Sequence, residues 1–77
     1  MQKKYRNGIM KEYILHELME GVMTTQMLTA CINLEFNKNF TCKQIYNKMY
    51  YYAKRRIIPI QRYNTGKHAY WAINPMY

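Results

Sequence analysis

Acidic residues are missing from the second half of the chain, residues 37–77. All four of them lie in residues 1–36 beside four Lys and Arg residues, so that half is neutral. A solvated surface normally mixes both signs, and a half of one sign predicts a polyanionic partner, usually nucleic acid. The whole net charge of +8 therefore lies on the eight basic residues of the second half, Lys38, Lys43, Lys48, Lys54, Arg55, Arg56, Arg62 and Lys67.

Long apolar runs are also missing. No segment approaches the ~20 apolar residues that span a bilayer, so we expect no membrane partner. The basic N-terminus is followed by neither an uninterrupted apolar segment nor a small-residue cleavage site, so we expect no signal peptide and a cytoplasmic or nucleoid-associated protein. The 77 residues predict one small domain spanning 1–77, with little room for a substrate-sized cavity.

Cysteines and acid–base pairs are scarce. The two cysteines, Cys31 and Cys42, form no CxxC pair, and a zinc site that added His16 and His68 would need an unusual spacing. We expect buried, reduced thiols and no metal. Glu17 lies beside His16 on an expected ordinary helix surface, and the chain contains no nucleophile elbow or phosphate loop. The sequence therefore predicts neither an enzyme nor a cofactor.

Two amphipathic segments fill the first half of the chain. The spacing of Met10, Ile14 and Leu18 predicts a helix over about residues 8–20, and a short strand is expected after it. A second periodic segment predicts a helix over about residues 25–36, with Thr24 or Thr25 as its N-cap.

The second half predicts a third helix followed by a β-hairpin. Thr41 with Gln44 three residues later is a capping-box pattern, so the third helix is expected over about residues 42–56. Pro59 prevents the helix from continuing. Residues 57–73 are rich in β-branched and aromatic side chains on both sides of "NTG", whose Asn and Gly suit a hairpin turn.

This order of elements resembles the winged helix-turn-helix family over nearly the whole chain. Residues 25–56 correspond to the helix-turn-helix and residues 57–73 to the wing, in an α+β fold with three helices and a C-terminal hairpin. The resemblance implies that the third helix enters the major groove of DNA and that the wing contacts the flanking backbone or minor groove.

The third helix has two different faces. A wheel at 100° per residue gathers Cys42, Ile45, Met49, Tyr52 and Ala53 on an expected core face, with Tyr46 and Tyr50 at its edge. The opposite face is polar and basic and holds Lys43, Gln44, Asn47, Lys48, Tyr51, Lys54 and Arg55. At the hairpin, Arg62, Lys67 and His68 surround the turn, while Trp71 is expected in the core.

These side chains suit duplex recognition. Gln and Asn bond bidentately to adenine, and Lys and Arg contact guanine or phosphate. Lys43, Gln44 and Asn47 lie where a recognition helix reaches base edges, near its start. Lys54 and Arg55 are expected on phosphates, with Tyr51 on phosphate or sugar.

Other interpretations of the same residues stay open. The polar face of the helix is also typical of an ordinary solvated surface. Tyr51, Tyr63 and Tyr70 are candidates for a single-strand stacking platform. Lys43, Asn47 and Tyr51 with Trp71 are similar to the stripe and wing tryptophan of Z-alpha domains, which recognise left-handed nucleic acid by backbone shape. The prolines of that family's wing are replaced here by His68 and Ala69.

The sequence thus predicts a small double-stranded DNA-binding regulator of transcription, of phage or mobile-element type. The sequence does not distinguish between duplex DNA and structured RNA as the partner. Such proteins commonly dimerise, and the neutral first helix is the expected dimer surface. The alternative is a protein-interaction module, a winged helix that binds and inhibits an acidic host protein.

Overall fold

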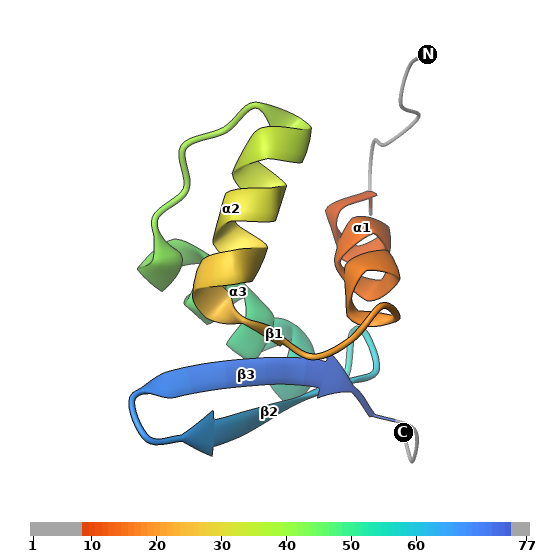
Figure 1. Cartoon of the computed structure of the whole chain (residues 1–77). Helices are drawn as coiled ribbons and strands as arrows, with labels where there is room; N and C mark the ends of the chain where they lie inside the picture. Colours follow the sequence, from red (N-terminus) through yellow and green to blue (C-terminus); the bar gives the residue numbers. More distant parts are fainter. Residues whose placement is uncertain (1–8, 75–77) are drawn as a thin grey trace.

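Three helices lie on one side of a three-stranded antiparallel sheet, which confirms the predicted α+β class (Figure 1). The computed structural model describes residues 9–74, apart from the side chain of Thr65. Within this range no helix has the length and apolar content needed to cross a bilayer. The elements are α1 (Ile9–Leu18), β1 (Met23–Thr24), α2 (Thr25–Phe36), α3 (Cys42–Lys54), β2 (Ile60–Thr65) and β3 (His68–Ile73).

The sheet places β3 between β1 and β2. Trp71 at its centre is opposite Met23 on one side and Arg62 on the other, so these three side chains point towards the helices. The predicted hairpin is present, but Asn64 is a strand residue paired with Ala69 and does not belong to the turn. Gly66 supplies the positive φ of 66° that the two-residue turn between the strands requires.

Local hydrogen bonds decide where α2 and α3 begin. The Thr24 hydroxyl accepts a hydrogen bond from the Met27 backbone N–H at 3.1 Å, and α2 covers the range expected from the sequence. At α3 both halves of the capping box form between Thr41 and Gln44.

The third helix ends at Lys54, before the predicted residue 56. Arg56 has a left-handed φ of 55°, and the Ile57 N–H bonds to the Tyr52 carbonyl at 2.9 Å. With the bond from the Arg56 N–H to the Ala53 carbonyl at 3.2 Å, this is a Schellman ending. Capping of the last carbonyls therefore turns the chain before the proline is reached.

The first helix is shorter than predicted. Its last residue is Leu18, and the turn after it ends at Gly21, whose φ is 153°. The expected start at Gly8 lies outside the described residues. Its apolar side chains Ile9, Tyr13, Ile14 and Leu18 are buried in this domain.

The core is a single layer between the helices and the sheet. Its fully buried members come from every helix and from β3, namely Ile14, Leu28, Ile32, Ile45, Met49 and Trp71. The predicted core position of Trp71 is confirmed, and its indole Nε1–H donates to the Thr25 hydroxyl at 2.8 Å. The predicted core position of Cys42 is wrong: this first residue of α3 is exposed and lines an open groove.

We expect Thr25→Val to lower the free energy of unfolding by about 1–3 kcal/mol, because the buried Trp71 N–H loses its acceptor while the side-chain volume is kept. Urea denaturation followed by Trp fluorescence measures the change. The neighbouring exposed Gln26→Ala is the control and is expected within about 0.5 kcal/mol of the parent. A Thr25→Val variant as stable as this control would show that the bond is dispensable.

Candidate nucleic-acid interface

The polar face of α3 is exposed along the whole helix. Burial of Ile45 and Met49 fixes the rotation of the helix, so that the opposite side faces solvent. Tyr51 is 50% exposed, Lys48 is half-buried at the margin, and the remaining members of the face are exposed, namely Lys43, Gln44, Asn47, Lys54 and Arg55. The structure therefore brings the seven expected residues of this helix onto one surface.

The side chain of Gln44 already accepts a hydrogen bond at the start of the helix. Its side-chain Oε1 accepts a hydrogen bond from the Thr41 backbone N–H at 2.9 Å, as one half of the capping box. Bidentate reading of adenine needs both the oxygen and the NH2 group of the amide. Gln44 therefore offers a base only its NH2 group while the box is intact. Asn47, one turn further along, is the exposed amide of the face that plays no part in capping.

Arg62 connects β2 to α3. Its Nη1 donates to the hydroxyl of Tyr46, and its guanidinium carbon lies 5.4 Å from the Tyr50 ring centroid and 6.0 Å from that of Tyr46. The rings of Tyr46 and Tyr50 stack with their centroids 6.3 Å apart. We call Arg62, Tyr46 and Tyr50 the Arg62 clamp. Cation–π attraction and the hydrogen bond together hold the hairpin at one position beside the helix.

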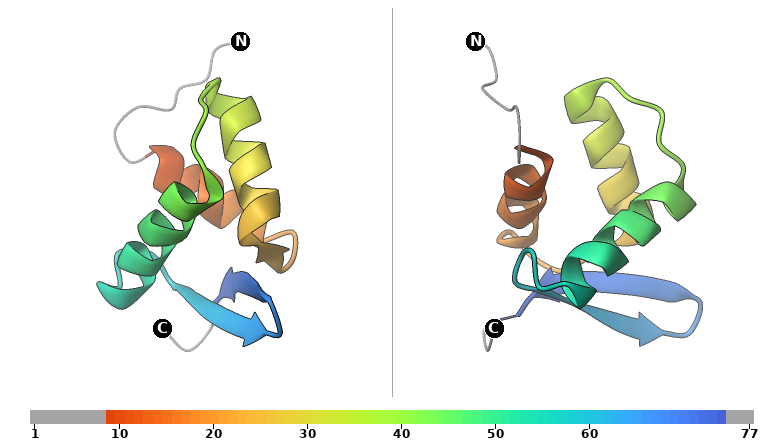
Figure 2. Two further views of the ribbon diagram at one scale, coloured as in Figure 1. Left: turned by 90° about the vertical axis from the view of Figure 1, so that its left-hand side faces the viewer. Right: turned by 180° about the vertical axis from the view of Figure 1, so that it is seen from behind.

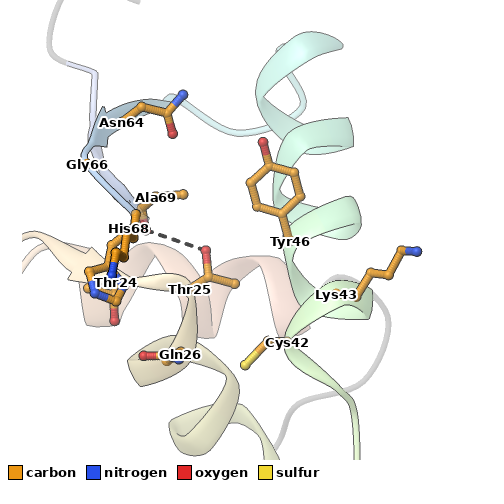
Figure 3. Close-up of a pocket in the computed structure, with 11 residues that line it drawn as sticks. Thr24, Thr25, Gln26, Cys42, Lys43, Tyr46, Asn64, Gly66, His68 and Ala69 are labelled. Carbon is orange, nitrogen blue, oxygen red and sulfur yellow. Dashed lines mark hydrogen bonds between the residues drawn. The ribbon is translucent and has the colours of Figure 1, made fainter.

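A groove of about 410 Å³ separates the start of α3 from the tip of the hairpin (Figure 3). Tyr46 and Cys42 point into it from the α3 side, whereas the Lys43 side chain extends away from it towards the exposed helix face. A hydrogen bond of 3.5 Å from the Thr25 hydroxyl to the Ala69 carbonyl marks the base of the groove. The structure thus does not bring every predicted residue together, because Lys67 and His68 lie at the hairpin side of this groove.

The interface offers cations, an amide and aromatic rings. The Arg55 guanidinium carbon lies 5.5 Å from the Tyr51 ring centroid, and the Lys54 ammonium lies 5.8 Å from that of Tyr50 at the edge of the face. Among residues 9–74 no three His, Cys, Asp or Glu side chains gather as a metal site. These groups can bind and orient a polyanion.

The residues whose pKa values are shifted do not belong to the exposed polar face of α3. Burial raises the pKa of Tyr13, whose hydroxyl donates to the Cys31 carbonyl at 3.3 Å, and the negative charge of Glu17 adds to the effect. Burial also raises the pKa of the Cys31 thiol, again with a contribution from Glu17. At Tyr52 burial raises the pKa first and the neighbouring Tyr51 adds to it. All three shifts follow from packing in or against the core.

Compared with protein-family models, curated proteins and solved structures, the chain matches none of them. Its function is therefore inferred from the interface itself. Sequence reasoning missed two features of that interface, the exposure of Cys42 and the contact of Arg62 with two tyrosines. The spacing of Tyr46 and Tyr50 on one helix edge was visible, but nothing in the sequence indicated which strand residue would lie over them.

Arg62→Gln is expected to release the hairpin from α3, because it removes the cation from both tyrosine rings. Amide hydrogen exchange in β2 should accelerate, and the free energy of unfolding should fall by about 0.5–1 kcal/mol. Lys67→Gln removes the same charge at the exposed hairpin tip and is the matched control, with no expected change in exchange at β2. Equal effects of the two substitutions would mean that charge, and not the clamp, holds the hairpin.

The two cysteines should differ in reactivity. Cys42 is exposed at the groove, whereas Cys31 is half-buried and has a raised pKa, so less of it is thiolate at neutral pH. We expect iodoacetamide at pH 7.5 to label Cys42 several-fold faster than Cys31, as followed by mass spectrometry of peptides. Raising the pH should bring the labelling rates of the two cysteines closer together, because more of Cys31 then becomes thiolate. Equal rates at pH 7.5 would contradict the packing of Cys31 described above.

Proposed function

We propose that the protein is a winged helix-turn-helix protein that binds double-stranded DNA and regulates transcription. In this proposal α3 is the recognition helix in the major groove and the β2–β3 hairpin is the wing on the flanking backbone. The observation that carries it is that α3 and the hairpin contain no acidic residue and are joined by the Arg62 clamp, so that their basic side chains lie on both sides of one groove. Such a surface is suited to a polyanion that spans both elements.

The dimensions of α3 support insertion in the major groove. Its 13 residues span about 20 Å at 1.5 Å per residue, and the groove is about 12 Å wide, enough for a helix. Lys43 and Asn47 lie one turn apart on the exposed face, where they would contact base edges. Tyr51, Lys54 and Arg55 would then contact the backbone near the other end of the helix.

The wing would approach the backbone beside the major groove. Lys67 and His68 at its tip lie across the groove of Figure 3 from α3, so the two elements would contact separate parts of the backbone. Arg62 would act partly by holding the wing in place and partly through donors that the Tyr46 hydroxyl does not use.

The positions of two of the acids are consistent with this orientation. Glu17 and Glu20 line a different groove of about 250 Å³ with Val22 and Met27, to which neither α3 nor the hairpin contributes a residue. The proposal places a regulator of phage or mobile-element type in the cytoplasm or on the nucleoid.

Dimerisation through α1 would use the polar groups left on its surface, since its main apolar residues are in the core.

Duplex binding should weaken steeply with salt, because neutralised phosphates release counterions. We expect Asn47→Ala to cost about 1–3 kcal/mol on a selected sequence and little on random duplexes. Lys54→Gln should reduce the steepness of the slope of log K against log salt by about 0.9, because the proposal places Lys54 on a phosphate. The charge-matched control is Lys38→Gln, in the loop before α3, which should leave the slope unchanged. Fluorescence anisotropy on selected and random duplexes at several salt concentrations measures all three variants.

Two outcomes would overturn the proposal. One is the absence of duplex binding at low salt; the other is an Asn47→Ala variant that binds every duplex as the parent does. In the first case, salt-sensitive binding to an acidic protein domain would favour the protein-interaction module instead. Protection of Cys42 from alkylation by bound duplex is an independent readout, because that thiol lies in the groove beside the start of α3.

A further inference from the structure

The second face of the sheet is uncovered. Side chains alternate along a strand, and Trp71 points to the helices, so its neighbour Tyr70 points the other way. The cross-strand partner of Tyr70 on β2 is Tyr63, which shares its face. Both views of Figure 2 show all three helices on the same side of the sheet, and no described element covers the other side.

This face carries the aromatic rings of Tyr63, which is exposed, and of Tyr70, which is half-buried. Tyr63 is 46% exposed, and its hydroxyl accepts a hydrogen bond of 2.7 Å from the Gln61 amide. The rings of His68 and Tyr70 meet edge to face, with centroids 6.5 Å apart and planes at 82°. We call Gln61, Tyr63, His68 and Tyr70 the aromatic sheet face. Because its rings do not stack on one another, they retain flat surface for another planar group.

The aromatic sheet face is separate from the α3 face. Tyr51, which the sequence grouped with Tyr63 and Tyr70, lies on α3 over the guanidinium of Arg55 and does not belong to the sheet. Arg62 points to α3, whereas its neighbours Gln61 and Tyr63 point outward. One hairpin therefore presents different side chains on its two sides.

We propose that the aromatic sheet face binds unpaired bases of single-stranded nucleic acid. Two neighbouring tyrosine rings on an open sheet can each stack on a base, and such stacking tolerates any sequence because every base has a flat π surface. The Gln61 amide and the His68 ring lie beside them, where they can bond to base edges or phosphate. No acidic residue lies on the hairpin, and Lys67 at its tip adds a positive charge that attracts the strand.

This site shares its ligand class with the proposed duplex interface but lies mainly on the other side of the hairpin. His68 at the hairpin tip borders both, because it contacts Tyr70 and also lines the groove beside α3. A protein that holds a duplex on α3 and unpaired bases behind the hairpin would suit a junction between the two forms. A single-stranded DNA segment and a single-stranded RNA segment present the same bases and phosphates, so both are probes of the site.

The test compares short single strands with a duplex. Anisotropy is measured with labelled octamers, dT8 and rU8, and with a 20-base-pair duplex, on the parent and on Tyr63→Leu/Tyr70→Leu. We expect the double variant to bind the octamers at least tenfold more weakly and the duplex within twofold of the parent. Tyr63→Phe/Tyr70→Phe keeps the rings and should keep octamer binding. Leu34→Ala, at an exposed position of α2, is the control for general effects.

Crosslinking tests the site without a substitution. Octamers that contain 5-iodouracil should crosslink on irradiation to Tyr63 or Tyr70, as located by mass spectrometry, and this readout does not depend on the folding of a variant. The proposal is overturned if the parent binds neither octamer, if the leucine variant binds octamers like the parent, or if crosslinks fall only on α3. If the protein does not bind the duplex but still binds the octamers through the two tyrosines, the proposed function is wrong and this site stands. If it binds the duplex but not the octamers, only this site is wrong.

Discussion

The hydrogen bond between the Trp71 indole and the Thr25 hydroxyl connects the sheet to the helices at the centre of this small domain. Thr25 begins α2 and Trp71 lies on the middle strand, so the bond joins segments 46 residues apart. The rings of Tyr46 and Trp71 meet edge to face with their centroids 5.7 Å apart, and Arg62 in turn lies over Tyr46. A chain this short has one core layer, and the position of its exposed interface therefore depends directly on that layer.

The alternation of side chains along β2 and β3 gives the hairpin two roles. Trp71 and Arg62 face the helices, where one forms the core and the other holds α3. Tyr63, which is exposed, and Tyr70, which is half-buried, face away from the helices. A slip of one residue in the register would exchange these two sets, so the burial of Trp71 also determines which tyrosines face outward.

Charge is segregated in space as well as along the chain. Lys54 lies over the Tyr50 ring of the Arg62 clamp, while Glu17 and Glu20 border a groove that is lined by no residue of α3 or of the hairpin. Lys54, Arg55 and Arg62 all lie over tyrosine rings, which offsets part of the repulsion between like charges. A polyanion would relieve the repulsion that remains, which supports the proposed binding of nucleic acid.

Short-range interactions allowed much of the secondary structure of this protein to be predicted from its sequence. The caps expected at Thr24 or Thr25 and at Thr41 act over three residues and predicted where α2 and α3 begin. The two-residue period of "KHAYWAI" predicted that either Trp71 or Tyr70 would face the core, and Trp71, the residue favoured, is the buried one. Tertiary structure alone decided that Cys42 is exposed, that Asn64 belongs to a strand and that Arg62 lies over Tyr46 and Tyr50. The Tyr46–Arg62 contact spans 16 residues and exists because the hairpin docks beside α3. Helix period, caps and strand alternation are local properties, whereas the side chains that meet between elements depend on how those elements pack around Trp71.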